Sequence, residues 1–186
     1  SARNLHDTQL PTDIRKLLDR HRVPAKMLQL EITESSIMTE PGRARRVLET
    51  LHDMGIHIAI DDFGTGYSSL SYLQQLPVSE IKIDRSFVTG MLQNQANGVI
   101  VRSTIDLARN LGLHLTAEGV ECEETLEHLR AAGCDSAQGF FISRPLPASE
   151  LERWVTARMP VEDELDDADD ADNVVLLSSL RAAQAG

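Results

Sequence analysis

Hydrophobic residues recur at helical spacing in several segments of this chain, and each such segment is followed by a glycine and a short apolar run. Apolar spacing of three and four marks one buried helix face, and glycine tolerates the left-handed backbone that ends many helices. Three segments share this plan, with glycines at 55, 112 and 133 and apolar runs at 56–60, 113–117 and 134–137. Short apolar runs of this kind are typical of strands in a parallel sheet.

Further elements extend the same alternation. Residues 27–30 and 80–83 read as two more strands, and residues 13–21 as an opening helix. A last helix is predicted to begin at Ser149, which forms an S-x-x-E capping box with Glu152. We assign Leu151 and Trp154 of that helix to the core. Strands alternating with helices predict an α/β fold with a parallel sheet.

Polar residues at the predicted strand ends favour a barrel over an open sheet. Between residues 31 and 138 five of them recur at a mean spacing of about 27 residues, near the ~31 residues per unit of a (β/α) barrel. They are Glu31, Asp61, Lys82, Glu118 and Gln138. In a barrel the active site is built from the carboxyl ends of several strands, so these side chains are expected to converge. An open doubly wound sheet more often carries a G-x-G-x-x-G loop after a strand, and none stands there.

The length of the chain bounds its domain organisation. About 160 residues precede an acidic segment, which is fewer than the ~200 of a complete barrel. We therefore expect that one or more βα units precede Ser1. The domains are predicted to be an incomplete barrel over residues 1–158 and a disordered acidic tail over residues 159–186.

Charge and composition limit the classes of binding partner and the location that we expect for the chain. Eight acids and no base lie between residues 162 and 172, and without those eight charges the net charge of −11 becomes −3. The body therefore has no basic stripe for long nucleic acid. No window approaches the ~18–20 apolar residues of a membrane segment, and no secretory signal opens the chain. Cys122 and Cys134 are read as free thiols, so a cytoplasmic location is predicted.

Four carboxylates are expected on one rim: Glu31, Asp61, Asp62 and Glu118. Like charges at short range raise one another's pKa, so converging acids call for a cation. Carboxylate oxygens suit Mg²⁺ or Mn²⁺, and the adjacent pair Asp61 and Asp62 suits two ions acting on a phosphoester. The alternative is that each acid caps a turn in solvent.

Lys82 and the loop after the acids complete the candidate site. Between Ile81 and Ile83, Lys82 points into the barrel if its neighbours point outward, where it would steady phosphate charge. The other interpretation is a surface lysine. The loop over residues 62–69 is rich in glycine and hydroxyls, and it is interpreted as a phosphate contact, or as a lid and partner contact. The alternative is a flexible connector.

With these residues assembled, the chain resembles the EAL-domain family of cyclic di-GMP phosphodiesterases. The resemblance covers roughly residues 1–158 and rests on five motifs in the family's order. They are LEITES at 30–35, DDFGTG at 61–66, KID at 82–84, AEGVE at 117–121 and QG at 138–139.

The resemblance implies a modified TIM barrel with one antiparallel strand, and a reaction that opens one phosphodiester of cyclic di-GMP to give linear pGpG. Glu31, Asp61, Asp62 and Glu118 would be metal ligands, with Asp61 shared between two ions of Mg²⁺ or Mn²⁺. Lys82 would hold the attacking water or neutralise developing charge. Glu34 would anchor loop 63–69, which the family also uses to couple a homodimer, and Glu121 and Gln138 would orient groups around the site.

Two pieces of the family's site have no counterpart in the chain. The Glu-Ala-Leu signature, whose Glu is a ligand, and a strand-end Asn are both expected before Ser1. Asn4 is in the wrong register to replace that Asn. Two alternatives to the enzyme follow: a non-catalytic module that binds the nucleotide or a protein partner, and a fragment that does not fold alone.

Overall fold

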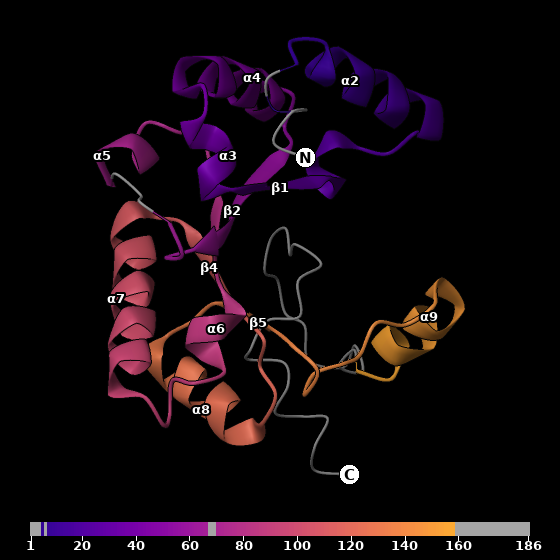
Figure 1. Cartoon of the computed structure of the whole chain (residues 1–186). Coiled ribbons are helices and arrows are strands. Elements are labelled where there is room, and N and C mark those ends of the chain that lie inside the picture. Colours follow the sequence, from indigo (N-terminus) through magenta and orange to yellow (C-terminus); the bar gives the residue numbers. More distant parts are fainter. Residues whose placement is uncertain (1–4, 6, 67–69, 159–186) are drawn as a thin grey trace.

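The computed structural model describes residues 5, 7–66 and 70–158, and a sheet of five strands runs through them (Figure 1). The strands are β1 (Gln29–Thr33), β2 (His57–Phe63), β3 (Glu80–Ile83), β4 (His114–Glu118) and β5 (Ser136–Gln138). They lie in chain order, and all four neighbouring pairs are parallel. The predicted α/β architecture with a parallel sheet is confirmed. The antiparallel strand implied by the family is not among these five.

Helices connect the strands, and those between β1 and β5 cover one side of the sheet. The longer ones are α2 (Leu10–His21), α4 (Pro41–Asp53), α7 (Gln95–Leu111), α8 (Glu123–Ala132) and α9 (Ala148–Thr156). Gly112 and Gly133 end α7 and α8 in left-handed conformation, and Gly55 follows α4 with φ of 85°, as the sequence predicts. Short helices also occur, and the hydrophobic pattern did not predict them: η1 (Ala25–Met27), α3 (Glu34–Met38), α5 (Leu70–Leu73) and α6 (Arg85–Val88).

Two strands differ from the prediction at their ends. Residues 25–27 form a 3-10 turn, so β1 begins at Gln29 and not at Met27. Its ladder with β2 runs on to the pair Thr33 and Asp61, and β2 in turn reaches Phe63, which pairs with Ile83. Glu31 and Asp61 therefore lie inside their strands, where the backbone is fixed by pairing, and not in the loops that follow.

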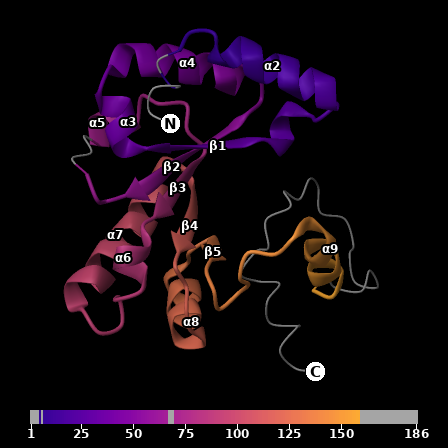
Figure 2. The same cartoon turned by 45° about the vertical axis from the view of Figure 1, so that its right-hand side comes forward.

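The last helix was predicted wrongly in two respects. Pro147 precedes α9 and no side chain caps it, so Ser149 lies inside the helix and the capping box does not form. Leu151 is 48% exposed and Trp154 is only partly buried, so neither belongs to the core. In both Figure 1 and Figure 2 α9 stands apart from the sheet. The Trp154 ring instead carries the Arg158 guanidinium, 4.3 Å from the ring centroid.

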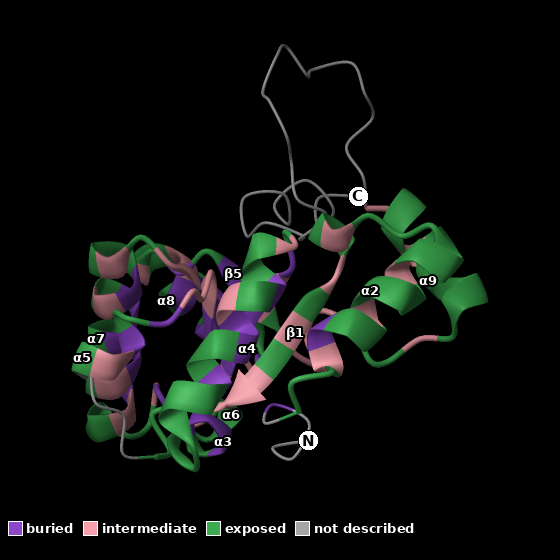
Figure 3. Cartoon of the chain, turned by 90° about the horizontal axis from the view of Figure 1, so that it is seen from above, coloured by how far each residue is buried: buried purple, intermediate pink, exposed green. Residues whose placement is uncertain are grey.

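The core lies between the sheet and the helices. Successive residues of a strand point to opposite faces, and on β1 to β4 one set packs on the helices while the other lies on the inner face of the sheet. Figure 3 shows the buried stripe on the inner sides of the helices. The fully buried aliphatic residues include Ile58, Ile81, Ile83 and Leu115 from strands, and Leu48, Leu51, Val101 and Leu129 from helices.

Three further predictions concern the membrane, the acidic tail and the cysteines. Among the described residues no helix is long and apolar enough to cross a bilayer. The acidic tail predicted over residues 159–186 lies outside the described residues. Both cysteines are free, with Cys122 exposed and Cys134 buried.

We predict that the two cysteines differ in reactivity. Burial raises the pKa of Cys134 to about 12, so this thiol is neutral and enclosed at neutral pH. The pKa of Cys122 is lowered, because the Thr125 side chain and backbone donate hydrogen bonds to its sulfur. Titration of the folded protein with a thiol reagent at pH 8 should modify Cys122 alone, and both after denaturation. Equal rates in the folded state would contradict the enclosed position of Cys134.

Candidate functional site

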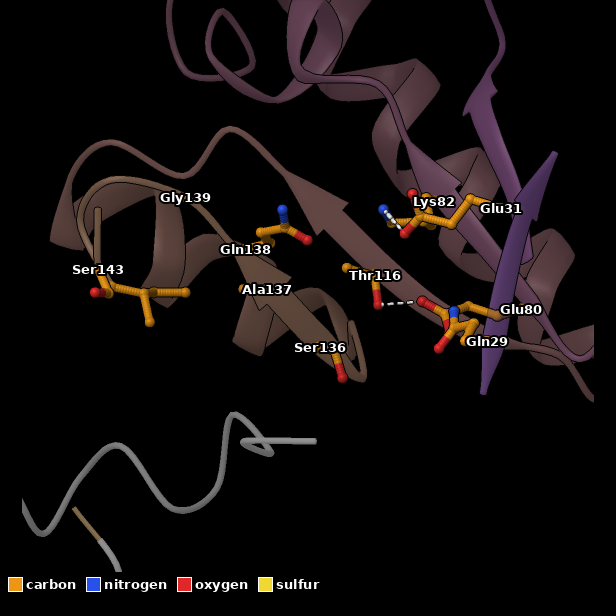
Figure 4. Close-up of a pocket in the computed structure, with 11 residues that line it drawn as sticks. Gln29, Glu31, Glu80, Lys82, Thr116, Ser136, Ala137, Gln138, Gly139 and Ser143 are labelled. Carbon is orange, nitrogen blue, oxygen red and sulfur yellow. Dashed lines mark hydrogen bonds and ion pairs between the residues drawn. The ribbon is translucent and has the colours of Figure 1, made fainter. Parts of the chain in front are cut away.

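Lys82 is the point at which acidic side chains from three other strands meet, and Figure 4 shows one of them, Glu31, beside it. Only 5% of the residue is exposed. Its Nζ lies 2.5 Å from Glu31 Oε1 on β1 and 2.5 Å from Glu118 Oε1 on β4. Asp61 Oδ1 on β2 is 4.0 Å away. Ile81 and Ile83 pack in the core on the opposite side of β3, so alternation alone turns Lys82 toward the acids.

The charge of Lys82 is fixed by these neighbours. Burial by itself lowers a lysine pKa, but hydrogen bonds to Glu118 and Glu31, together with their negative charge, raise the pKa of Lys82 well above its ordinary value. The ammonium therefore stays protonated through the neutral range. It can donate hydrogen bonds and neutralise charge, and it cannot act as a general base.

Asp61 and Asp62 lie where the β2–β3 ladder shifts register, between Ile60 and Phe63. An irregularity of this kind turns side chains away from strict alternation. The Asp62 amide donates to Asp61 Oδ1 at 3.0 Å, and Asp62 has a left-handed backbone with φ of 55°. Burial, the Asp61 charge and the Asp84 charge all raise the pKa of Asp62. Two adjacent acids are thus held near one strand end, and Asp62 adopts a backbone conformation that non-glycine residues rarely adopt.

Asp84 belongs to the same acidic group, although the sequence analysis did not assign it a role. Burial raises its pKa, but hydrogen bonds from the Ser86 side chain and backbone outweigh this effect and lower the pKa of Asp84. Its side chain caps α6 by accepting from the Ser86 amide at 3.0 Å. The spacing of Asp and Ser two residues apart after a strand is the signal that identifies this cap.

Glu34 lies in the first turn of α3 and is 6% exposed. Within the described residues neither of its carboxylate oxygens has a hydrogen-bond partner. It sits against the start of the glycine-rich loop: a Cβ added to Gly66 would lie 2.8 Å from Glu34 Oε1. The structure therefore places Glu34 against Gly66 of loop 63–69, and residues 67–69 of that loop lie outside the described residues.

The remaining two candidates lie in different positions. Gln138 ends β5, two strands from Lys82, and lines the same hollow. Gly139 follows it where the chain passes so close to the next loop that a Cβ would lie 2.1 Å from the Val120 carbonyl oxygen. Glu121 is exposed in the loop after β4, and it does not line the hollow.

The hollow has a volume of about 340 Å³ and opens on the inner face of the sheet. Figure 4 shows its lining residues reaching in from β1, β3, β4 and β5. They are Gln29, Glu31, Glu80, Lys82, Thr116, Ser136, Ala137, Gln138, Gly139, Ile142 and Ser143. An inner face this rich in polar groups differs from the branched aliphatic filling that is usual in barrels.

The acids do not form a ready-made ion cage in the described part of the chain. There, no three His, Cys, Asp or Glu side chains are grouped so that they could hold a metal ion as they stand. Lys82 Nζ lies between the carboxylates of Glu31 and Glu118 instead.

Comparison with known proteins places this geometry in a family. The family model for the EAL domain matches residues 1–145. The bifunctional diguanylate cyclase/cyclic di-GMP phosphodiesterase MucR of Pseudomonas aeruginosa is 44% identical over 151 residues, which are 81% of this chain and 22% of that protein. The cyclic di-GMP phosphodiesterase NbdA of the same organism is 40% identical over 156 residues, 84% of this chain and 20% of that protein. The chain thus spans about a fifth of the length of these relatives.

Solved structures of EAL-domain proteins also match the fold of this chain. The PaMucR phosphodiesterase in complex with c-di-GMP superimposes with a TM-score of 0.79 at 44% identity, over 81% of this chain and 61% of that one. The EAL domain of Mycobacterium smegmatis DcpA gives a TM-score of 0.76 at 42% identity, over 82% and 69%. The five parallel strands are therefore part of a modified TIM barrel, and the chain belongs to the EAL-domain family.

Proposed function

We propose that this chain contributes the metal-binding face of a phosphodiesterase that hydrolyses cyclic di-GMP to linear pGpG. One observation carries the proposal: carboxylates from β1, β2 and β4 lie within 4.0 Å of the buried Lys82 Nζ on β3. A similar solved structure, PaMucR phosphodiesterase, is a c-di-GMP complex, which supports this nucleotide as the substrate.

The donor set fits Mg²⁺ or Mn²⁺. Glu31, Asp61, Asp62 and Glu118 offer only oxygen ligands, which these ions prefer. Burial and the charges of Asp61 and Asp84 raise the pKa of Asp62, and a cation bound beside it would favour its ionised form. We propose these four acids as the ligands. The chemistry that bound divalent ions supply in such a site is activation of a water and neutralisation of charge on the leaving oxygen.

Lys82 is proposed to act as a fixed cation. Because its ammonium keeps its proton, it can donate a hydrogen bond to a phosphate oxygen or to the attacking water as charge develops. In the hydrolysis the water oxygen bonds to phosphorus, one phosphoester bond breaks and the departing ribose oxygen takes up a proton.

Three further residues are proposed to orient this site. Gln138 lines the hollow and offers an amide to the nucleotide. Glu34 anchors loop 63–69 from below, as its packing against Gly66 supports. Glu121 is proposed to orient a group at the rim, although its exposed position gives it no contact with the hollow.

A second function has a specific observation in its favour. Lys82 already neutralises Glu31 and Glu118, so the site is also compatible with a module that binds cyclic di-GMP without hydrolysing it. Tight nucleotide binding with no metal-dependent product would distinguish this module from the enzyme.

A homodimer is proposed through loop 63–69. The start of the loop is held firmly, since Phe63 is 7% exposed and a Cβ at Gly64 would lie 3.1 Å from the Phe87 ring. Light scattering after gel filtration should give twice the monomer mass, and a monomer mass at all concentrations would contradict the dimer.

A cytoplasmic location is also proposed. Both cysteines are unpaired, which is typical of proteins kept in a reducing compartment.

Asp61→Ala should abolish hydrolysis in the complete protein. The change removes the carboxylate between Lys82 and the neighbouring Asp62, and losing one such ligand typically lowers kcat by about 10²-fold or more. Product formation with Mg²⁺ or Mn²⁺ can be followed by chromatography of pGpG.

Asp13→Ala is the matched control, because Asp13 forms only an exposed pair with Lys16. That variant should keep full turnover. Undiminished turnover by Asp61→Ala would exclude the proposed site.

Lys82→Met should destabilise the metal-free protein at pH 7. Three carboxylates would lose their shared cation, at a cost of about 2 kcal/mol. This is less than the ~3–5 kcal/mol of a fully buried pair, because the Glu31 side chain is 48% exposed. Thermal unfolding measures the loss, and MnCl₂ should raise the melting temperature of the variant more than that of the unaltered protein.

Lys16→Met provides the comparison, since its pair with Asp13 is exposed on both sides and the change should cost less than ~0.5 kcal/mol. An equal effect of MnCl₂ on both lysine variants would count against these carboxylates as ligands.

A further inference from the structure

A second polar layer lies directly beneath the acids of the site. On each strand the residue two positions before the site residue faces the same side of the sheet, because side chains alternate. From β1 to β5 these residues are Gln29, Ala59, Glu80, Thr116 and Ser136. Four of the five are polar and line the hollow. None of them has a role in the function proposed above.

Glu80 joins this layer together. Its Oε2 accepts a hydrogen bond from Gln29 Nε2 at 2.7 Å, and its Oε1 accepts one from Thr116 Oγ1 at 2.6 Å. Figure 4 shows Glu80 between Gln29 and Thr116. Both carboxylate oxygens are thereby used, and Thr116 is 7% exposed. Removing the carboxylate would leave the Thr116 hydroxyl without this acceptor in a buried position.

The contact to Gln29 passes over an entire strand. β2 lies between β1 and β3, and its residue in this layer is Ala59, which is fully buried and pairs with Glu80. A methyl group leaves room above β2 for Glu80 to reach Gln29. A longer side chain at position 59 would point into the space in which the two meet.

The lower layer repeats the pattern of the upper one on the same three strands. Above, Lys82 of β3 holds Glu31 of β1 and Glu118 of β4. Below, Glu80 of β3 holds Gln29 of β1 and Thr116 of β4, each two residues earlier in its strand. The donor and acceptor roles are reversed, because a central cation is surrounded by acids above and a central acid by neutral donors below.

We propose that Glu80 is a positioning residue for the site, which fixes β1 and β4 relative to β3 one layer below the proposed ligands. Glu31 lies on an edge strand of the described sheet, so its ladder with β2 and these cross-strand contacts help to determine its distance from Lys82. Groups one step removed from metal ligands commonly set affinity and rate in this way. The consequence for turnover rests on the proposed function, whereas the consequence for ion binding does not depend on turnover.

The decisive test exchanges the two groups. In the double variant Gln29→Glu/Glu80→Gln the amide stands on β3 and the carboxylate on β1, so the hydrogen bond between them and the one from Thr116 can both form. Each single variant disrupts the pair: Gln29→Glu sets two carboxylates opposite each other, and Glu80→Ala removes the acceptor. Only a role in positioning predicts that the exchange restores function.

We expect Glu80→Ala and Gln29→Glu, in the complete protein, to lower kcat for cyclic di-GMP and Mn²⁺ affinity by about 10- to 100-fold. The measurements are made at a temperature where circular dichroism shows each variant fully folded. The exchange variant should return to within about threefold of the unaltered protein. Glu49→Ala, which removes only the exposed pair with Arg45, is the control and should change neither quantity.

Two results would overturn the positioning role: a folded Glu80→Ala that keeps its kcat and its Mn²⁺ affinity, or an exchange variant as impaired as the single variants. Absence of hydrolysis by the unaltered protein would count against the proposed function alone, because Mn²⁺ affinity, measured by calorimetry, tests Glu80 without turnover.

Discussion

The site depends on a buried positive charge. An ammonium in the interior is costly unless acids surround it, and three acids at one sheet edge are costly unless a cation lies among them. Lys82 and the carboxylates of Glu31, Asp61 and Glu118 resolve both problems at once. Each strand must then have the register and the distance from β3 that bring its acid to Lys82 Nζ. The parallel strand pairing sets the register, and the side-chain contacts across the inner face set the distance between the strands.

The two faces of the sheet therefore have different roles. The outer face packs aliphatic residues such as Ile58 and Leu115 against helices, which supplies most of the hydrophobic stabilisation. On the inner face polar side chains take the place of aliphatic ones. Their contacts contribute little net free energy to folding but require a strict geometry. The register shift between Ile60 and Phe63, with the left-handed Asp62, marks the point where regular pairing yields to the requirements of the site.

Local signals in the sequence predicted the elements that local physics determines. Gly112 and Gly133 end their helices because glycine tolerates positive φ, and Ile81 and Ile83 turn Lys82 inward by alternation. Features that depend on distant neighbours were not predictable. The exposure of Leu151 reflects where α9 lies in space, and the exposure of Glu121 reflects the path of one loop. The Gln29 to Glu80 contact requires a strand register that no local pattern encodes.

The long sequence separation of the polar contacts has a consequence for folding. Glu31 and Lys82, like Gln29 and Glu80, are 51 residues apart, and Glu80 and Thr116 are 36 apart. Helices form from neighbours within microseconds, whereas contacts that close long loops form slowly. None of these pairs can form before β1, β3 and β4 are aligned. The site therefore forms only once these strands are aligned, whereas helices can form earlier from local contacts.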